Sequence, residues 1–337
     1  MKAAVVESAG KLSIRDLPAP AMGEYEARCE MLYGSVCAGT DTHLLHFHPP
    51  FCHWVKLPYI LGHESTGRVV AIGAKVRNLK PGDVITRVGC PGVGGVNIAW
   101  GGFAETGIAT DWRALQEDGL SGWQDKTVQQ ILPADIDPAV GTLFITWRET
   151  LSYSTRMGIR PGVSVLVIGS GGNGLAFVAH ARNLGATQVV LVGSGERTTV
   201  GAWAGATVSF DYRHTDCWKQ VQAAVPGGYD FVIDAVGKAT ITAHGQSCLK
   251  PGGTLGIYGL DECGQITLAA GPTFTFYNGG YNEAEAHEAV LKFYRAGQLN
   301  PAVWFDRQQV FPLANIRLAL EAVAGRKLIK PLVQLAE

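Results

Sequence analysis

The stretch SVCAGTDTH, residues 35–43, contains a thiol, a hydroxyl, a carboxylate and an imidazole. Such a run is too polar for a core strand. Thiolates and imidazoles are ligands that zinc prefers, and a catalytic zinc site keeps one position open for water or substrate. Taken alone, the stretch is compatible with half of a metal site, and equally with a polar loop in which Cys37 is merely a buried thiol.

A second stretch, VLVIGSGGNGL, has the glycine spacing of a dinucleotide-binding fingerprint. It follows an apolar strand-like run and opens a helix-like run, which is the context that this fingerprint requires. Gly169 permits the tight turn, Gly171 lets a pyrophosphate approach the backbone, and Gly174 lets helix and strand pack closely. The helix start, at Gly172 and Asn173, offers free N–H groups to phosphates. The sequence therefore predicts dinucleotide binding.

The predicted secondary structure, which must position these groups, changes from mainly β to alternating strands and helices near residue 150. Before it, short alternating or β-branched runs separated by Gly and Pro predict a β-rich unit with long loops. After it, strand-like and helix-like segments alternate, which predicts a doubly wound parallel sheet. The predicted strands cover residues 2–8, 25–32, 65–73 and 83–89, then 163–169, 187–193, 207–211, 229–237 and 252–259. An amphipathic helix over 283–299 and a short strand over 330–335 end the chain.

Composition narrows the class of protein. The chain has 337 residues, of which 47% are hydrophobic, enough for two packed domains. Its formal net charge is -1 without runs of like charge, so we expect a small-molecule substrate and neither nucleic acid nor a membrane as partner. The N-terminus lacks a signal-peptide core and no apolar run is long enough to span a membrane, so we expect a cytoplasmic protein. Seven scattered cysteines without a CxxC pair suit reduced thiols.

The order of these parts resembles the medium-chain dehydrogenase/reductase superfamily over nearly the whole chain. The resemblance rests on LPYILGHESTGRVVAIG, LKPGDVI and GGFAE, followed by the glycine fingerprint. It is closest to the zinc-dependent alcohol and polyol dehydrogenases, which keep the triplet seen here as Gly62, His63 and Glu64.

The resemblance implies an α/β fold of two domains. A GroES-like catalytic domain, 1–145 completed by 285–337, would surround a Rossmann domain, 146–284. The active site would lie in the cleft between them. Pairing through the Rossmann domain would give a homodimer or homotetramer.

The resemblance also assigns roles to the opening stretch. In the zinc enzymes a Cys binds the metal, a Ser or Thr relays the proton, and a His two residues past an Asp passes it to solvent. Cys37, Thr40, Asp41 and His43 match in type and order. The spacing differs, because two residues, Ala and Gly, separate Cys37 from Thr40 where the usual pattern has one. A glycine there can let the backbone bulge and re-aim the thiol.

The triplet would complete the metal site. His63 would be the second zinc ligand, and Glu64 would be the family's flexible carboxylate beside the metal. Asp41 would orient His63 and fix its tautomer. The alternative is that His63 is only a hydrogen-bonded loop residue beside a buried Cys37 thiol.

Two departures from the family pattern weaken the metal assignment. The further ligand position, a Cys or Glu before the RPG turn, falls on Ile145 or Thr146, neither of which is a good zinc ligand. Glu149 lies about one helical turn on, so it could replace the missing ligand only if the helix is displaced, with Thr146 or water as the other options. The alternative is that the neighbouring Arg148 holds Glu149 in an ion pair. Only Cys90 stands where a structural zinc would need four cysteines, so one catalytic zinc and no structural zinc is expected.

The histidine-rich segment HLLHFHPPFCHW, residues 43–54, invites a second metal site. Two prolines prevent it from forming a helical ligand face, so a substrate-cleft loop is the preferred interpretation. Trp54, Trp100 and Trp147 are candidate pocket walls by the same resemblance, and they are equally compatible with a core position.

The cofactor is predicted from the residues after the second Rossmann strand. Enzymes that use NAD present an acid there, whereas a 2'-phosphate needs that acid absent and a cation near. Gly193 and Ser194 occupy the acidic position, Arg197 is close, and Tyr212 follows the next strand, as in the NADP-using alcohol dehydrogenases. NADP(H) is therefore preferred, although Glu196 keeps NAD(H) possible.

The sequence thus predicts a zinc-dependent, NADP(H)-preferring alcohol dehydrogenase or carbonyl reductase for a secondary alcohol, polyol or sugar-like substrate. One alternative is a zinc-free quinone or enoyl reductase of the same superfamily. Another is a dinucleotide-binding protein without turnover.

Overall fold

The computed structural model of the chain describes residues 1–262, 266, 268 and 273–336. One of the seven cysteines, Cys263, lies outside the described residues, and the other six are free thiols. The chain forms two compact units: Met1–Ile145 with Trp304–Glu337, and Thr146–Val303. None of the helices in the described part of the chain has the length and apolar character needed to cross a bilayer.

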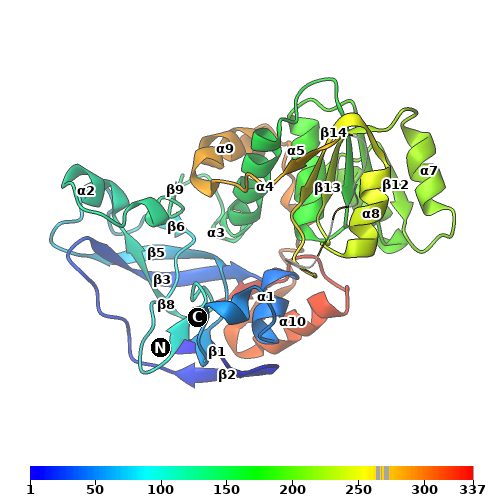
Figure 1. The fold of residues 1–337 in the computed structure, drawn as a ribbon. Helices are drawn as coiled ribbons and strands as arrows, with labels where there is room; N and C mark the ends of the chain where they lie inside the picture. Colours follow the sequence, from blue (N-terminus) through cyan, green and yellow to red (C-terminus); the bar gives the residue numbers. More distant parts are fainter. Residues whose placement is uncertain (263–265, 267, 269–272, 337) are drawn as a thin grey trace. The chain divides into compact units, whose positions relative to one another are not determined.

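The first unit is built on two β-sheets (Figure 1). Their strand orders are β2-β1-β4-β7 and β16-β17-β3-β5-β6-β9, with β8 also paired to β3. In β3 the residues Ala27, Cys29 and Met31 are buried at every second position, as the alternating sequence predicts. The strands are β1 (Lys2–Ser8), β2 (Lys11–Asp16), β3 (Glu26–Ser35), β4 (Tyr59–Ile60), β5 (Glu64–Ile72), β6 (Val84–Thr86), β7 (Asn97–Ile98), β8 (Thr106–Thr110), β9 (Ile131–Leu132), β16 (Val310–Pro312) and β17 (Leu332–Gln334). The helices are α1 (Thr40–Leu45), α2 (Trp112–Glu117), α3 (Pro138–Gly141) and α10 (Ile316–Ala324), and α4 (Leu143–Met157) begins here and continues into the second unit.

The second unit is a parallel sheet of order β12-β11-β10-β13-β14-β15. This is the order of a Rossmann fold, and it confirms the predicted doubly wound sheet. Helices α4 and α5 lie on one face and α7 and α8 on the other (Figure 1). The strands are β10 (Ser164–Ile168), β11 (Gln188–Gly193), β12 (Val208–Asp211), β13 (Tyr229–Asp234), β14 (Leu249–Ile257) and β15 (Thr275–Tyr277). The helices are α5 (Gly172–Asn183), α6 (Thr198–Ala204), α7 (Cys217–Ala224), α8 (Ala239–Ser247) and α9 (His287–Arg295).

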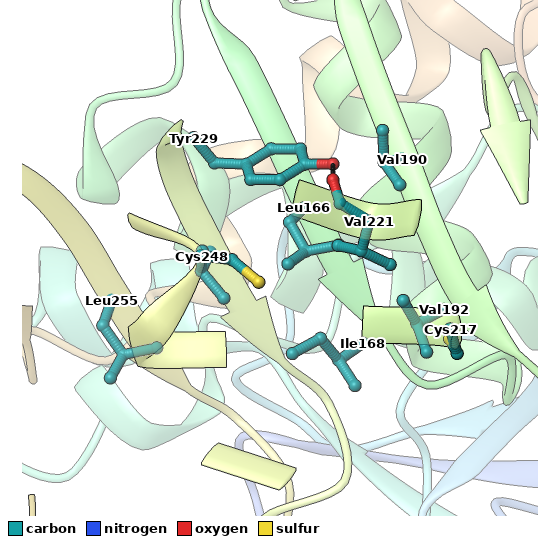
Figure 2. Packing of buried hydrophobic residues seen from close by; sticks show 10 residues of the cluster. Leu166, Ile168, Val190, Val192, Cys217, Val221, Tyr229, Cys248 and Leu255 are labelled. Carbon is teal, nitrogen blue, oxygen red and sulfur yellow. Dashed lines mark hydrogen bonds between the residues drawn. The ribbon is translucent and has the colours of Figure 1, made fainter. Parts of the chain in front are cut away.

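A buried apolar cluster joins the sheet to helix α7. Figure 2 shows Leu166 and Val190 from adjacent strands facing Val221, and the Tyr229 hydroxyl donating to the Val221 carbonyl at 2.7 Å. That hydrogen bond satisfies the one polar atom of the tyrosine inside the apolar cluster.

The return to the first unit differs from the expected boundary. The sequence placed it at residue 285, whereas residues up to Val303 belong to the second unit. The reason is the packing of α9, whose Tyr294 ring lies 6.0 Å from Trp147 and whose Phe293 ring lies 6.3 Å from His180. Through these rings α9 contacts α4 and α5 of the second unit.

Candidate metal centre and dinucleotide site

Strand pairing in the first unit brings Cys37, His63 and Glu64 together. Strands β3 and β5 are antiparallel with Ser35 opposite Glu64, so the end of one strand meets the start of the other. One ligand atom from each of the three residues lies within 4.8 Å of the other two, and all three are buried. Ligand atoms of a tetrahedral zinc site are about 3.3–3.8 Å apart, so small side-chain adjustments would close this set around zinc. The donor set of sulfur, nitrogen and oxygen fits zinc.

The carboxylate of Asp41 links two of these residues. One of its oxygens lies 3.1 Å from Nδ1 of His63, and the other accepts the backbone N–H of Cys37 at 2.8 Å. Burial disfavours the protonated ring, but the Asp41 carboxylate outweighs it and raises the pKa of His63 to about 10. Nδ1 is thus engaged and Nε2 faces Glu64, with Oε1 of Glu64 at 3.7 Å.

Lys330 also contacts this cluster, and the sequence analysis did not predict it. Its buried Nζ lies 2.6 Å from Oε1 of Glu64, and Ser35 donates to Oε2 at 2.6 Å. Burial would raise the pKa of Glu64, but Lys330 outweighs it, together with His63 and Ser35, and lowers that pKa to about 2. Glu64 is therefore an ionised carboxylate with its own cationic partner inside the protein.

The extra residue between Cys37 and Thr40 is accommodated in the turn that leads into α1. Gly39 has an ordinary right-handed φ of -72°, so the expected glycine-dependent bulge is not formed. The helix begins at Thr40, and the Asp41 N–H donates to the Cys37 carbonyl at 3.0 Å. Thr40 and His43 are half-buried, and Nδ1 of His43 lies 2.9 Å from the Gly39 carbonyl. Cys37 stays in the cluster despite the unusual spacing.

Two of the three tryptophans lie beside the cluster. The Trp100 ring is 5.5 Å from the His63 ring and 5.4 Å from the Trp54 ring, and Phe51 contacts both tryptophans. The exposed fractions of Trp54 and Trp100 are 53% and 37%, which is high for such large apolar side chains. Trp147 is instead buried in the second unit.

The other candidate ligands take different places. In the described residues, Cys37, His63 and Glu64 are the one group of three with metal-binding geometry; the histidine-rich segment contributes none. His46 and His48 of that segment stack their rings 5.7 Å apart. Cys90 is buried, and burial raises the pKa of its thiol to about 12.

The residues at the further ligand position are committed to other contacts. Ile145 is a core residue. Thr146 donates to the Asn173 side chain at 3.3 Å, and Glu149 accepts the Tyr258 hydroxyl at 2.9 Å. Arg148 forms a buried ion pair with Glu283.

The glycine fingerprint adopts the geometry that dinucleotide binding requires. Gly169 has a φ of +113°, which favours glycine. A Cβ atom at Gly174 would lie 1.7 Å from the Gly169 carbonyl oxygen, so only glycine allows this close packing of helix and strand. Helix α5 starts at Gly172 directly after the turn, and a Cβ at Gly171 would meet nothing within 4 Å. The space beside Gly171, directly before α5, is therefore the place where a pyrophosphate would approach the backbone.

The residues predicted to select the cofactor lie at and after the end of β11, and Ser194 and Arg197 contact the fingerprint. The Ser194 N–H donates to the Ser170 hydroxyl at 3.2 Å, and Arg197 donates to the Ser170 carbonyl at 2.8 Å. Tyr212 is exposed after β12, and its N–H donates to Gly193 at 3.0 Å.

Two acids near this strand end, Glu196 and Asp211, are both paired with Arg213. The Arg213 guanidinium donates to both oxygens of Glu196, at 2.9 and 3.0 Å, and it also binds Asp211. Arg213 lowers the pKa of both carboxyls, that of Asp211 to about 2.

Comparisons with known proteins match a part of each unit to a known family. The alcohol dehydrogenase GroES-like domain matches residues 23–117, and the zinc-binding dehydrogenase family matches residues 172–278. The NADP-dependent isopropanol dehydrogenase of Clostridium beijerinckii is 31% identical, over 76% of this chain and 75% of its own. The L-threonine 3-dehydrogenase of Bacillus subtilis (strain 168) is 28% identical, over 74% of this chain and 73% of its own.

The whole fold is shared with a solved structure. The alcohol dehydrogenase TADH from Thermus sp. ATN1 superposes with a TM-score of 0.82 over 99% of both chains, at 23% identity. With the two family matches and the isopropanol dehydrogenase, this likeness confirms the α/β fold expected from the sequence. The chain belongs to the medium-chain dehydrogenase/reductase superfamily, and it is an NAD(P)-dependent oxidoreductase that acts on CH–OH groups.

Proposed function

We propose that this chain is a zinc-dependent, NADP(H)-preferring alcohol dehydrogenase or carbonyl reductase for a secondary alcohol, polyol or sugar-like substrate. The observation that carries the proposal is the buried cluster of Cys37, His63 and Glu64, with ligand atoms within 4.8 Å of one another. The isopropanol and L-threonine dehydrogenases named above support a hydroxyl-bearing substrate.

Each residue of the cluster has a distinct role in this proposal. Cys37 and His63 hold the metal, Glu64 lies beside it, and Asp41 keeps the His63 ring in one orientation. When bound, zinc lowers the pKa of a substrate hydroxyl and the nicotinamide exchanges hydride with the carbinol carbon. Thr40 takes up the hydroxyl proton, and His43, on the next turn of α1, passes it to solvent.

The preference for NADP(H) rests on the end of β11. Gly193 and Ser194 place no carboxylate where an NAD enzyme binds the ribose hydroxyls. Glu196 is engaged by Arg213, while Arg197 is held against the fingerprint by the Ser170 carbonyl. An arginine in that position suits a 2'-phosphate.

Titrating the protein with NADPH and NADH by fluorescence tests this preference. NADPH should bind at least tenfold more tightly, a difference of about 1.4 kcal/mol. Arg197→Ala should weaken NADPH binding and leave NADH binding nearly unchanged. Equal affinities, or tighter NADH, would contradict the assignment of Gly193, Ser194 and Arg197.

A zinc-free quinone or enoyl reductase is the second candidate. The observation that favours it is the Lys330 contact, because Nζ lies 2.6 Å from Glu64 and already neutralises that carboxylate. Metal analysis of protein purified without chelator separates the two. About one zinc per chain, with NADPH consumption on ketones, supports the dehydrogenase, whereas active metal-free protein that reduces enones or quinones supports the alternative.

We also propose that the protein is a homodimer or homotetramer. The described end strand of the parallel sheet, β15, leaves backbone groups on one side for a partner strand. Light scattering coupled to size-exclusion chromatography measures the assembly mass directly, and a monomer would contradict the proposal.

A further inference from the structure

Three histidines at the end of helix α1 lie in one row, and the proposed function uses only the first of them. The rings of His43 and His48 lie edge to face with their centroids 5.9 Å apart, and the ring of His46 stacks on His48 at 5.7 Å. His43 is half-buried, whereas His46 and His48 are exposed. The row of imidazoles therefore begins inside the protein surface and ends in solvent.

The backbone at the end of α1 brings His48 onto His43. The Phe47 N–H donates to the Leu44 carbonyl at 2.9 Å, and the His48 N–H donates to the His43 carbonyl at 2.8 Å. These two hydrogen bonds form a Schellman motif, in which the side chains at the two ends, here His43 and His48, meet. Phe47 occupies the left-handed position of the motif with a φ of +57°, where glycine is usual and another residue is strained. The chain thus keeps the two imidazoles together at the cost of backbone strain.

The hydrogen bond of the His43 ring limits how this ring exchanges a proton. Its Nδ1 lies 2.9 Å from the Gly39 carbonyl, which only accepts hydrogen bonds, so Nδ1 carries a hydrogen. Nε2 is therefore the ring nitrogen through which His43 both takes up a proton and gives it away. A ring that receives and releases a proton through one atom needs a second acceptor close by, and His48 is the imidazole that contacts it.

We propose that His48 accepts the proton from His43 and that His46 shares it at the surface. During alcohol oxidation the neutral His43 ring receives the proton from Thr40 at Nε2 and becomes an imidazolium. It transfers that proton to a ring nitrogen of His48, directly or through one water molecule, and becomes neutral again. The His48 imidazolium then loses the proton to a base in the solvent, with the stacked His46 ring as a further acceptor. His48 acts through His43 without touching the substrate, and this inference rests on the proton path of the proposed function.

A stopped-flow experiment on the first turnover follows hydride transfer and proton release separately. The absorbance of the reduced nicotinamide reports hydride transfer, with NADP+ or NAD+ as the cofactor, and a pH-indicator dye in weakly buffered solution reports the released proton. In the wild type the two signals should rise together. In His48→Gln, which keeps a polar side chain without an imidazole, the dye signal should lag behind the nicotinamide signal by roughly tenfold or more. Added imidazole should remove the lag, because the free base replaces the missing acceptor.

An exposed imidazole outside the row provides the control. His244 lies on α8, and His244→Gln should keep the two signals together. His46→Gln should show a smaller lag than His48→Gln, because His48 still exchanges its proton with solvent. If the signals of His48→Gln rise together, if imidazole does not shorten the lag, or if His244→Gln lags equally, the inference is overturned. A wild-type protein that reduces neither nicotinamide cofactor with any alcohol would overturn the proposed function itself.

Discussion

At the scale of single residues, the two oxygens of Asp41 explain why the metal cluster tolerates an unusual spacing. A buried carboxylate is costly unless both oxygens accept hydrogen bonds. One oxygen is bound by the Cys37 backbone N–H at 2.8 Å and the other faces the His63 ring at 3.1 Å. The same side chain therefore positions both proposed zinc ligands, Cys37 and His63, and the inserted residue changes only the turn between Cys37 and α1.

Removing the thiol tests the cluster directly. We expect Cys37→Ala to lose both bound zinc and alcohol oxidation, because one imidazole and a carboxylate already paired with Lys330 leave too few strong ligands. Elemental analysis and NADP+ reduction measure the two losses. Cys52→Ala is the matched control, because Cys52 is a half-buried thiol in the histidine-rich segment and should leave both unchanged. A fully active Cys37→Ala protein would favour the zinc-free reductase.

Thr40 separates proton transfer from metal binding. We expect Thr40→Val, which keeps the side-chain shape, to retain zinc and cofactor while turnover falls by roughly 100-fold or more, as for loss of a proton-transfer group. Thr42, on the same helix, supplies the control, and Thr42→Val should turn over at the wild-type rate. Unchanged turnover in Thr40→Val would remove Thr40 from the proton path.

At the scale of elements, the periodicity of a segment predicts its secondary structure but not the element against which it packs. The alternating run over 2–8 coincides with β1, and α5 lies within its predicted helix, because each pattern is a property of the segment itself. The partner of a segment is not encoded in the segment. The sequence of the amphipathic helix at 287–295 is compatible with packing on either unit. Trp147 contacts this helix in the second unit, so the burial of Trp147 could not be predicted without knowing where the helix packs.

The helix packing in the second unit also makes stability depend on pH. His180 is buried on α5, and burial lowers the pKa of its ring to about 3. An unfolded histidine titrates near 6.5, so between the two values the unfolded chain binds more protons than the folded chain. Stability is therefore complete above pH 6.5 and decreases as the pH falls toward 3.

Replacing the His180 ring should make the unfolding free energy less sensitive to acid. We expect the wild type to lose about 2 kcal/mol of unfolding free energy through His180 between pH 8 and pH 5, and His180→Phe to lack this contribution. Urea unfolding at the two pH values measures the difference. The exposed His244 provides the control, since His244→Phe should keep the wild-type slope. Parallel pH profiles for wild type and His180→Phe would show that His180 titrates normally.

At the scale of the whole chain, the buried cluster of Cys37, His63 and Glu64 contacts a side chain from near the C-terminus. Lys330 and Glu64 are 266 positions apart. They meet because β17 pairs with β3 with Leu332 opposite Ser35, and β3 pairs with β5 with Ser35 opposite Glu64. The sequence contains no local signal for this meeting, since Lys330 precedes a proline in a short strand and looks like a surface lysine. Cys37 and His63 could be predicted from their residue types and their order in the family's motifs, whereas the contact of Lys330 follows only from strand register.

That long-range pair predicts that the stability of the protein depends on the proposed zinc. We expect Lys330→Met to destabilise the metal-free protein by about 3–5 kcal/mol, because Glu64 remains as a buried charge without its counter-ion. The zinc-loaded Lys330→Met variant should lose less stability, because a cation held by Cys37 and His63 would also balance the negative charge of Glu64. Denaturant unfolding with and without chelator measures both losses. Lys327→Met, an exposed lysine of the same segment, should change stability by no more than about 0.5 kcal/mol in either state. An equal loss in Lys330→Met with and without zinc would mean that Glu64 does not face the metal.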